Sequence, residues 1–275
     1  MFQYKKLHTK LEWLRLSLYH SAALKDFNHQ NYKRVIMLIN AKNILEKLNP
    51  HNKINYDSVL QEVIADWQQE AVRPKLLIHS CCAPCSTYVL EYLAQYADIT
   101  IYFANSNIHP RVEYEHRSLV QQKFINDFNL KTGHNVQFLE APYQPAEFVK
   151  QVGHLRDEPE GGERCHLCYK MRLDLAAIKA QELGFDYFAS ALTLSPKKNS
   201  QKINQLGFEI QEIFSVNYLP SDFKKNNGYK RSIELCKEYD VYRQCYCGCI
   251  FAAKAQGVDL KNVIAIAKQG LEKMS

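Results

Sequence analysis

The stretch Lys75–Ser86, with the sequence KLLIHSCCAPCS, limits the fold of this chain more than any other part. Its residues Leu76–His79 form a short apolar run that predicts a buried β-strand. A turn follows that carries three cysteines, Cys81, Cys82 and Cys85. Pro84 lacks an N–H and has a fixed φ, so it suits the first turn of a helix. The stretch therefore predicts a strand, a cysteine-rich loop and a helix. Loops at the carboxyl ends of strands in open α/β sheets are where ligands bind.

Strand and helix patterns alternate along the rest of the chain. We expect further strands at 99–105, 136–139, 187–192 and 208–214. We expect helices at 57–67, 88–96, 114–128, 146–152, from 165 to Gly184, at 195–206 with Gly207 as its stop, at 233–239, and from 263 onward. This alternation predicts an α/β fold with a mostly parallel sheet and helices on both faces.

The first fifty residues differ from the rest in charge. They carry nine Lys or Arg and three Asp or Glu, an excess equal to the net charge of +6 of the whole chain. We expect residues 1–54 to form a basic helical extension and residues 55–275 to form the α/β catalytic domain. The extension either holds phosphates through a salt-dependent attraction or presents a solvated helical face. The sequence leaves both interpretations open.

Apolar runs and cysteine usage indicate the compartment. No run of 18 apolar residues appears, so no membrane span is expected, and the first residues lack the pattern of a secretory signal. These features predict a cytoplasmic protein, where thiols stay reduced. Nine cysteines in such a protein indicate metal or redox chemistry more than a disulfide framework.

The cysteines fall into three clusters, with Cys236 alone and predicted to be structural. The clusters are Cys81-Cys82-x-x-Cys85, Cys165-x-x-Cys168 and Cys245-x-Cys247-x-Cys249. Because Cys165 and Cys168 are three residues apart on a predicted helix, they share a face and can bind one metal centre together. Four thiolates hold either zinc or an iron–sulfur cluster, and the residues alone do not separate the two. A position at the carboxyl end of a strand favours a functional cluster over a structural zinc.

The third cluster has different chemistry. Cys247-Gly248-Cys249 places two thiols one residue apart, around a glycine that permits unusual dihedral angles. Such a pair can cycle between a dithiol and a strained, redox-active disulfide. The alternative interpretation is a second pair of metal ligands.

Five motifs together resemble the QueH family of cobalamin-independent epoxyqueuosine reductases, over about residues 55–255. They are HSCCAPCS at 79–86, NIHPRVEYEHR at 107–117, ERCHLCYKMRL at 163–173, LTLSPKKN at 192–199 and YRQCYCGC at 242–249. The resemblance implies an adenine nucleotide hydrolase-like fold. It also implies an oxidoreductase for the last step of queuosine biosynthesis. That enzyme reduces the epoxide of epoxyqueuosine at the wobble position of tRNA to queuosine, with release of water, using an external electron donor.

The resemblance also implies roles for individual cysteines. Cys81, Cys82, Cys165 and Cys168 would hold a [4Fe–4S] cluster. Cys247 and Cys249 match the family's redox-active or second-metal pair. Cys85 would be an alternate ligand or would hold one additional iron. The acid that protonates the departing oxygen is sought among His79, His109 and Tyr242, which lie near the motifs in sequence.

Two other classes of protein compete with this interpretation. One is an ATP-dependent tRNA-thiolating enzyme on the same type of fold. The sequence contains neither a P-loop nor G-x-G-x-x-G, which argues against it. The other is a zinc-stabilised RNA-binding module without catalysis, which would contain zinc and no iron.

Overall fold

The computed structural model of the chain describes residues 41–46 and 53–274, and these belong to one compact unit, residues 39–275. Most of the predicted basic extension, residues 1–40 and 47–52, therefore lies outside the described residues. The structure describes one short helix of the predicted extension, α3 (Ala41–Leu45). The side chains of Ala41 and Ile44 in this helix are buried. The predicted boundary at residue 54 stays a prediction.

Five strands form one sheet in which every neighbouring pair is parallel. The strands are β1 (Lys75–His79), β2 (Asp98–Phe103), β3 (Gln137–Glu140), β4 (Tyr187–Ser190) and β5 (Asn217–Tyr218), in the order β3-β2-β1-β4-β5. Central strand β1 has no exposed side chain after Lys75, because it lies between β2 and β4 and is covered on both faces. The prediction of a mostly parallel α/β sheet is confirmed.

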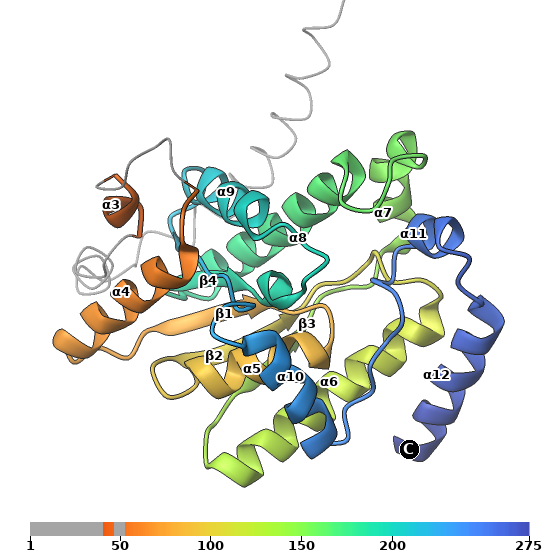
Figure 1. Cartoon of the computed structure of the whole chain (residues 1–275), viewed down its shortest axis with the longest axis horizontal. Helices are drawn as coiled ribbons and strands as arrows, with labels where there is room; N and C mark the ends of the chain where they lie inside the picture. The colour runs from red at the N-terminus through yellow and green to blue at the C-terminus, as the bar shows by residue number, and fades with distance from the viewer. Residues whose placement is uncertain (1–40, 47–52, 275) are drawn as a thin grey trace, which may run out of the picture. The chain divides into compact units, whose positions relative to one another are not determined.

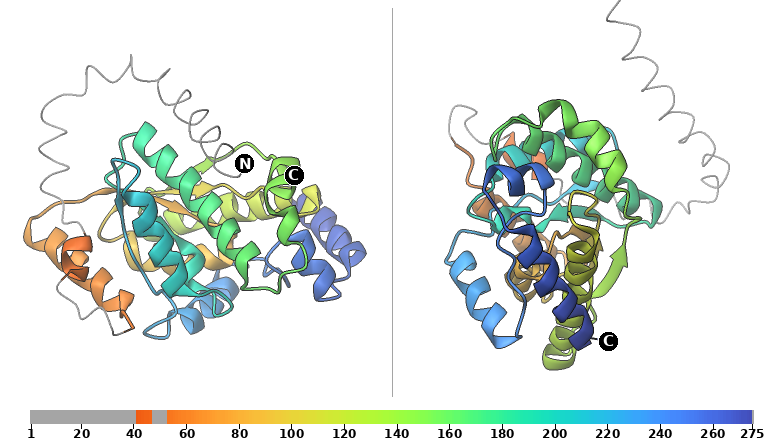
Figure 2. Two further views of the ribbon diagram at one scale, coloured as in Figure 1. Left: turned by 90° about the horizontal axis from the view of Figure 1, so that it is seen from above. Right: turned by 90° about the vertical axis from the view of Figure 1, so that its right-hand side faces the viewer.

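Helices cover both faces of this sheet (Figure 1, Figure 2). One face carries α8 (Glu163–Glu182) and α9 (Ser200–Gln211), which pack on each other, with α8 also packing on β1 and β4. The other face carries α5 (Ala83–Leu93) and α6 (Arg111–Thr132). Outside them, α10 (Gly228–Glu238) packs on α5 and α12 (Leu260–Met274) packs on α6.

The remaining elements are short or lie at the ends of the sheet. They are α4 (Tyr56–Gln69), α7 (Pro145–Val152), the 3₁₀ turns η2 (Gly153–Leu155) and η3 (Ala191–Leu194), and α11 (Ile250–Ala255). Helix α4 is joined to the core by Trp67, whose indole N–H donates to the Tyr187 hydroxyl at 3.2 Å. No helix among the described residues is long and apolar enough to cross a membrane.

Three predictions between residues 195 and 214 were wrong. Residues 208–214 continue α9 and the turn after it instead of forming a strand, and the fifth strand is the two-residue β5. Gly207 does not end the helix but lies inside it, where it faces Tyr218. A Cβ at this position would lie 2.3 Å from the Tyr218 ring, so the glycine is required for close packing and not for a helix stop. The helix also begins later than expected, at Ser200, where Asn199 caps it.

Candidate functional site

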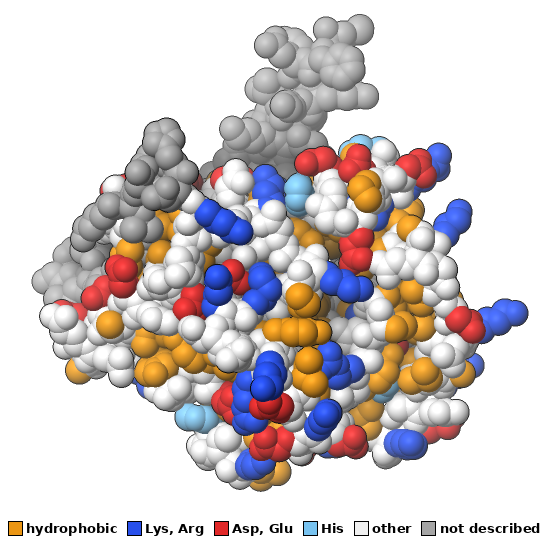
Figure 3. All heavy atoms as spheres, in the orientation of Figure 1, with side chains coloured by type: hydrophobic (Ala, Val, Ile, Leu, Met, Phe, Trp, Pro, Cys, Tyr) orange, Lys and Arg blue, Asp and Glu red, His pale blue; other side chains and the backbone are white. Residues whose placement is uncertain are grey.

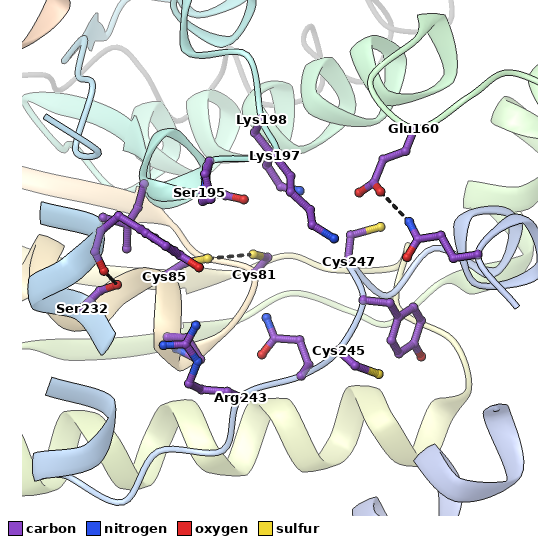
Figure 4. A pocket seen from close by; sticks show the side chains of 17 residues that line it. Cys81, Cys85, Glu160, Ser195, Lys197, Lys198, Ser232, Arg243, Cys245 and Cys247 are labelled. Carbon is purple, nitrogen blue, oxygen red and sulfur yellow. Dashed lines mark hydrogen bonds between the residues drawn. The ribbon is translucent and has the colours of Figure 1, made fainter. Parts of the chain in front are cut away.

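The site lies where the strand order of the sheet reverses. Strand β1 is followed in the chain by β2 on one side, whereas its other neighbour is β4, more than a hundred residues later. After β1 the chain crosses to β2 on one side, and after β4 it crosses to β5 on the other side. In doubly wound sheets, two connections that part in this way leave a crevice at the carboxyl ends of the two strands. Cys81 follows the end of β1, and the loop Ser195–Lys198 follows η3 after β4. Both line one pocket at this edge (Figure 4).

Three thiols stand close together in the turn between β1 and α5. The Sγ atom of Cys81 lies 3.5 Å from that of Cys82 and 3.7 Å from that of Cys85, and Cys82 and Cys85 are 3.3 Å apart. Hydrogen bonding with the thiols of Cys82 and Cys85 holds the pKa of the Cys81 thiol well below its usual range. The hydrogen bond with Cys81 raises the pKa of Cys82 to about 12, and Cys81 and Cys82 together raise that of Cys85. Cys81 is therefore the first of the three to lose its proton.

The second cysteine pair lies on the first turns of α8, as the sequence predicts. Cys165 packs against the group of buried residues that contains Cys81 and Cys82, and its sulfur accepts the backbone N–H of Gly161 at 3.2 Å. Cys168 is buried in a different group, together with Cys249, and burial raises its pKa to about 11. The pair thus lies between the first and third cysteine clusters. Neither thiol joins the close triad of Cys81, Cys82 and Cys85 among the described residues.

The third cluster lies on an irregular segment, residues 243–249, that side chains fasten to the site. The Gln244 amide donates to the Cys82 sulfur at 2.8 Å, and the backbone N–H of His109 donates to the Gly248 carbonyl at 2.8 Å. Gly248 has a φ of 101°, and a Cβ there would lie 2.7 Å from Ile108. Only glycine fits this approach, so the C-G-C pair is docked directly on the loop after β2.

Arg117 on α6 contacts the same segment, residues 243–249. It is 1% exposed, pairs with Glu113 at 2.7 Å, and donates to the Tyr246 carbonyl at 3.2 Å. Its guanidinium also lies over the Tyr246 ring at 5.1 Å. The buried ion pair therefore ties the Tyr246 carbonyl to α6 through Nη2 of Arg117, while Nη1 has no partner among the described residues.

The pocket exposes some of these thiols and covers the others. Cys81, Cys85, Cys245 and Cys247 line it, whereas Cys249 is buried behind Cys247. Lys198 reaches the same space and interacts electrostatically with the Cys81 and Cys247 thiols. Burial lowers the pKa of this ammonium, but Tyr169, Cys247 and Cys81 outweigh burial and raise it above its usual value. A cation therefore faces the two thiols across the pocket.

None of the three candidate acids is among the described residues that line this pocket. His79 is fully buried under it, between Ser190 at 3.3 Å and Asn105 at 3.2 Å, and burial lowers its pKa to about 3. The Tyr242 hydroxyl donates to Glu113 at 3.3 Å. His109 lies behind the C-G-C segment, on a separate surface groove with Tyr143. These side chains support the site instead of lining it.

Sequence patterns alone missed three residues that shape the site: Lys198, Gln244 and Arg117. Lys198 lies in the motif LTLSPKKN and Gln244 in YRQCYCGC, so the motifs contained them but gave them no role. Arg117 ends the motif NIHPRVEYEHR. Each of the three residues acts through a contact with a segment that is remote in the chain, and local sequence patterns do not reveal such contacts.

Comparisons with known proteins give the family. The sequence profile described as "Epoxyqueuosine reductase QueH" matches residues 76–255. The chain is 62% identical to epoxyqueuosine reductase QueH of Streptococcus pyogenes serotype M1 over 84% of this chain and 91% of that protein. It is 61% identical to QueH of Staphylococcus aureus, over 86% of this chain and 98% of that protein. One solved structure, the U34-tRNA thiolase NcsA from Methanococcus maripaludis with its [4Fe-4S] cluster, overlaps 74% of this chain and 73% of that chain. Its TM-score of 0.40 and 13% identity are too low to support an argument.

The matched residues include all three cysteine clusters and the described residues that line the pocket, except Gln256. Both relatives are matched over nine-tenths or more of their own length. The chain belongs to the QueH family of epoxyqueuosine reductases.

Proposed function

We propose that this protein reduces epoxyqueuosine in tRNA to queuosine, in the cytoplasm, with electrons from an external donor. The observation that carries the proposal is a pocket at the switch point of the sheet where cysteines of the first and third clusters meet, with the second cluster packed between them. Removing the epoxide oxygen as water and leaving a C=C bond consumes two electrons and two protons. Two thiols supply both as they join in a disulfide, so a dithiol matches the reaction in electrons and protons.

The donor set fits a [4Fe–4S] cluster, since thiolates are the ligands that such clusters use. Cys81 and Cys82 with Cys165 and Cys168 would hold it, and Cys85 remains the alternate ligand or the holder of one additional iron. When bound, the cluster supplies single electrons. Two buried polar atoms near Cys82 have no partner in the described chain, Nη1 of Arg117 and Oε1 of Gln244. Unpaired buried polar atoms are costly, and the Arg117 N–H is suited to a charged sulfur-rich group.

Cys247 and Cys249 differ in their access to the pocket. Cys247 lines the pocket and faces the substrate, whereas Cys249 is buried beside Cys168. In the proposed cycle the two thiols give two electrons and two protons to the substrate and form a disulfide. The external donor then returns two electrons, and solvent returns two protons. Between them, Gly248 adopts a φ of 101°, a conformation that favours glycine over any residue with a side chain.

The departing oxygen needs a partner, and Lys198 is the cation that lines the pocket next to Cys247. We place the epoxide oxygen against its ammonium group. The N–H groups then stabilise the negative charge that develops as the C–O bond breaks. This assignment replaces His79, His109 and Tyr242, because their side chains have other partners away from the pocket.

Protein purified without oxygen tests the proposal through its metal. We expect iron and acid-labile sulfide in equal amounts, or one extra iron per cluster if Cys85 holds it, and a visible absorption band. We also expect epoxyqueuosine in tRNA to lose one oxygen atom, which mass spectrometry of the nucleosides measures. Colourless protein that holds zinc without iron would refute the iron–sulfur assignment. ATP consumption with sulfur transfer to tRNA would point to the thiolating enzyme instead.

A further inference from the structure

The rim of the pocket carries three cations from two separate segments. Lys197 and Lys198 come from the loop after β4, and Arg243 from the segment before the C-G-C pair. Figure 4 shows the two lysines and Arg243 on opposite sides of the pocket. The face seen in Figure 3 carries many Lys and Arg side chains around its middle.

None of these cations has a carboxylate partner among the described residues: the ion pairs of Lys and Arg there involve other side chains. The single acidic side chain that lines the pocket, Glu160, accepts a hydrogen bond from Gln256 at 2.5 Å. Lys224 braces the lysine loop, since its ammonium donates to the carbonyls of Thr193 at 3.3 Å and Lys198 at 3.4 Å. The rim thus carries three cations against one carboxylate, and none of the three is paired with it.

One aromatic side chain stands on the same rim. Tyr229, in the first turn of α10, lines the pocket and is 37% exposed. Its place is fixed by Gly228, where a Cβ would lie 2.1 Å from the Phe223 carbonyl and 2.4 Å from the Tyr88 ring. An exposed ring held beside cations is the arrangement on which nucleic-acid bases stack.

We propose that Lys197, Arg243 and Tyr229 form the surface that grips the RNA on both sides of the reacting nucleoside. The inference rests on the proposed function. A nucleoside turned out of its strand into the pocket carries one phosphate on its 5′ side and one on its 3′ side. Lys197 and Arg243 stand on opposite sides of the pocket and bind one phosphate each. Tyr229 stacks on a neighbouring base.

An RNA strand fits this rim better than an acidic electron-donor protein does. Acidic side chains would satisfy the cations, but a protein partner offers no reason for a half-exposed tyrosine at the mouth of a pocket that must admit a nucleoside. The rim also leaves the pocket open between the cations, which a strand can straddle. A protein seated there would close it.

Binding of full-length, anaerobically purified protein to an unmodified tRNA transcript, measured across a range of salt concentrations, tests the proposal. We expect Lys197→Ala/Arg243→Ala to weaken binding and to reduce the slope of log K against log salt by about 1.5, since two phosphate contacts are lost. Tyr229→Ala should weaken binding about tenfold at every salt concentration, and Tyr229→Phe should bind like the unaltered protein, because the ring does the stacking.

The matched control is Lys75→Ala/Lys179→Ala, which removes the same charge from the amino end of β1 and the far end of α8. It should leave affinity and slope unchanged. All variants should keep the iron–sulfur spectrum and react with dithionite alike, which separates this test from the test of the proposed function. Equal slopes in the rim and control variants would overturn the proposal. So would unchanged tRNA affinity with slower reduction by a flavodoxin-type donor, which would make the rim a protein-docking surface.

Discussion

The two cysteine segments that meet in the pocket are held in different ways. The turn with Cys81 and Cys82 grows out of central strand β1 and continues into α5, and main-chain groups fasten it: Ser80 N–H donates to Tyr102 O at 3.1 Å. The C-G-C segment has no regular structure and is held by the side chains of Arg117 and Gln244, together with the main-chain bond from His109 N–H to the Gly248 carbonyl. A turn built into the core keeps its thiols at fixed separations, as metal ligands require. A segment outside the helices and strands can change shape more easily, as a dithiol that closes into a disulfide requires.

The largest effect expected from this comparison lies in the rigid turn and its partners on α8. Replacing any of Cys81, Cys82, Cys165 or Cys168 with Ala should remove most iron and most turnover, because a thiolate ligand is lost. Iron analysis and the visible spectrum of anaerobically purified protein measure the loss of the cluster. Cys85→Ala is the informative companion: as an alternate ligand or holder of an extra iron, it should lose less iron than Cys165→Ala. Full iron in Cys165→Ala would show that the triad Cys81, Cys82 and Cys85 supplies the ligands instead.

The next largest effect should show that the two segments have different functions. Cys247→Ser and Cys249→Ser should each keep the iron–sulfur spectrum and lose turnover, because one thiol alone cannot store two electrons as a disulfide. Assay of epoxyqueuosine in tRNA with spectra of the same samples tests this. A fully active double variant would remove the functional difference between the segments. Loss of iron in either variant would make the C-G-C pair a set of metal ligands.

Lys198 faces thiols from both segments, and its removal should act on turnover alone. Lys198→Ala should lower the rate about 100-fold or more, the range found when one group that stabilises a developing oxyanion is removed. Lys198→Arg keeps the charge and should recover part of the rate. Iron content and tRNA affinity serve as controls. A drop in tRNA affinity that accounts for the whole loss would make Lys198 a residue that binds RNA, as proposed for Lys197 and Arg243, instead of one that stabilises the oxyanion.

Much of this arrangement was predictable from local sequence, and the exceptions share one cause. The strand–cysteine–helix unit at Lys75–Ser86 follows from an apolar run, a proline and turn residues that are neighbours in the chain. The strand predicted at 208–214 failed because the role of Gly207 is set by the Tyr218 ring, which only the folded sheet brings there. Gln244 and Lys198 were missed for the same reason, since each acts on a thiol more than a hundred residues away.

Stability should reveal how firmly the side-chain anchors hold the C-G-C segment. Arg117→Ala leaves Glu113 buried without its partner, so we expect a loss of about 3–5 kcal/mol of unfolding free energy. Arg111→Ala on the same helix is the matched control: its pair with Glu115, at 3.7 Å, is exposed and should contribute at most about 1 kcal/mol. Denaturant unfolding measures both. Equal losses in the two variants would mean that the ion pair does not anchor the segment.

The smallest effect should come from the cysteine that belongs to neither segment. Cys236 is buried on α10, near Arg243, and takes no part in the three clusters. Its thiol fills space under the rim, so Cys236→Ala should cost about 1 kcal/mol of stability or less and leave iron, turnover and tRNA affinity unchanged. This variant calibrates the others, because it loses a buried thiol without losing a ligand or a redox partner. If it lost iron as Cys165→Ala does, iron loss would report general loosening of the fold, and the contrast between the two segments would have to rest on turnover alone.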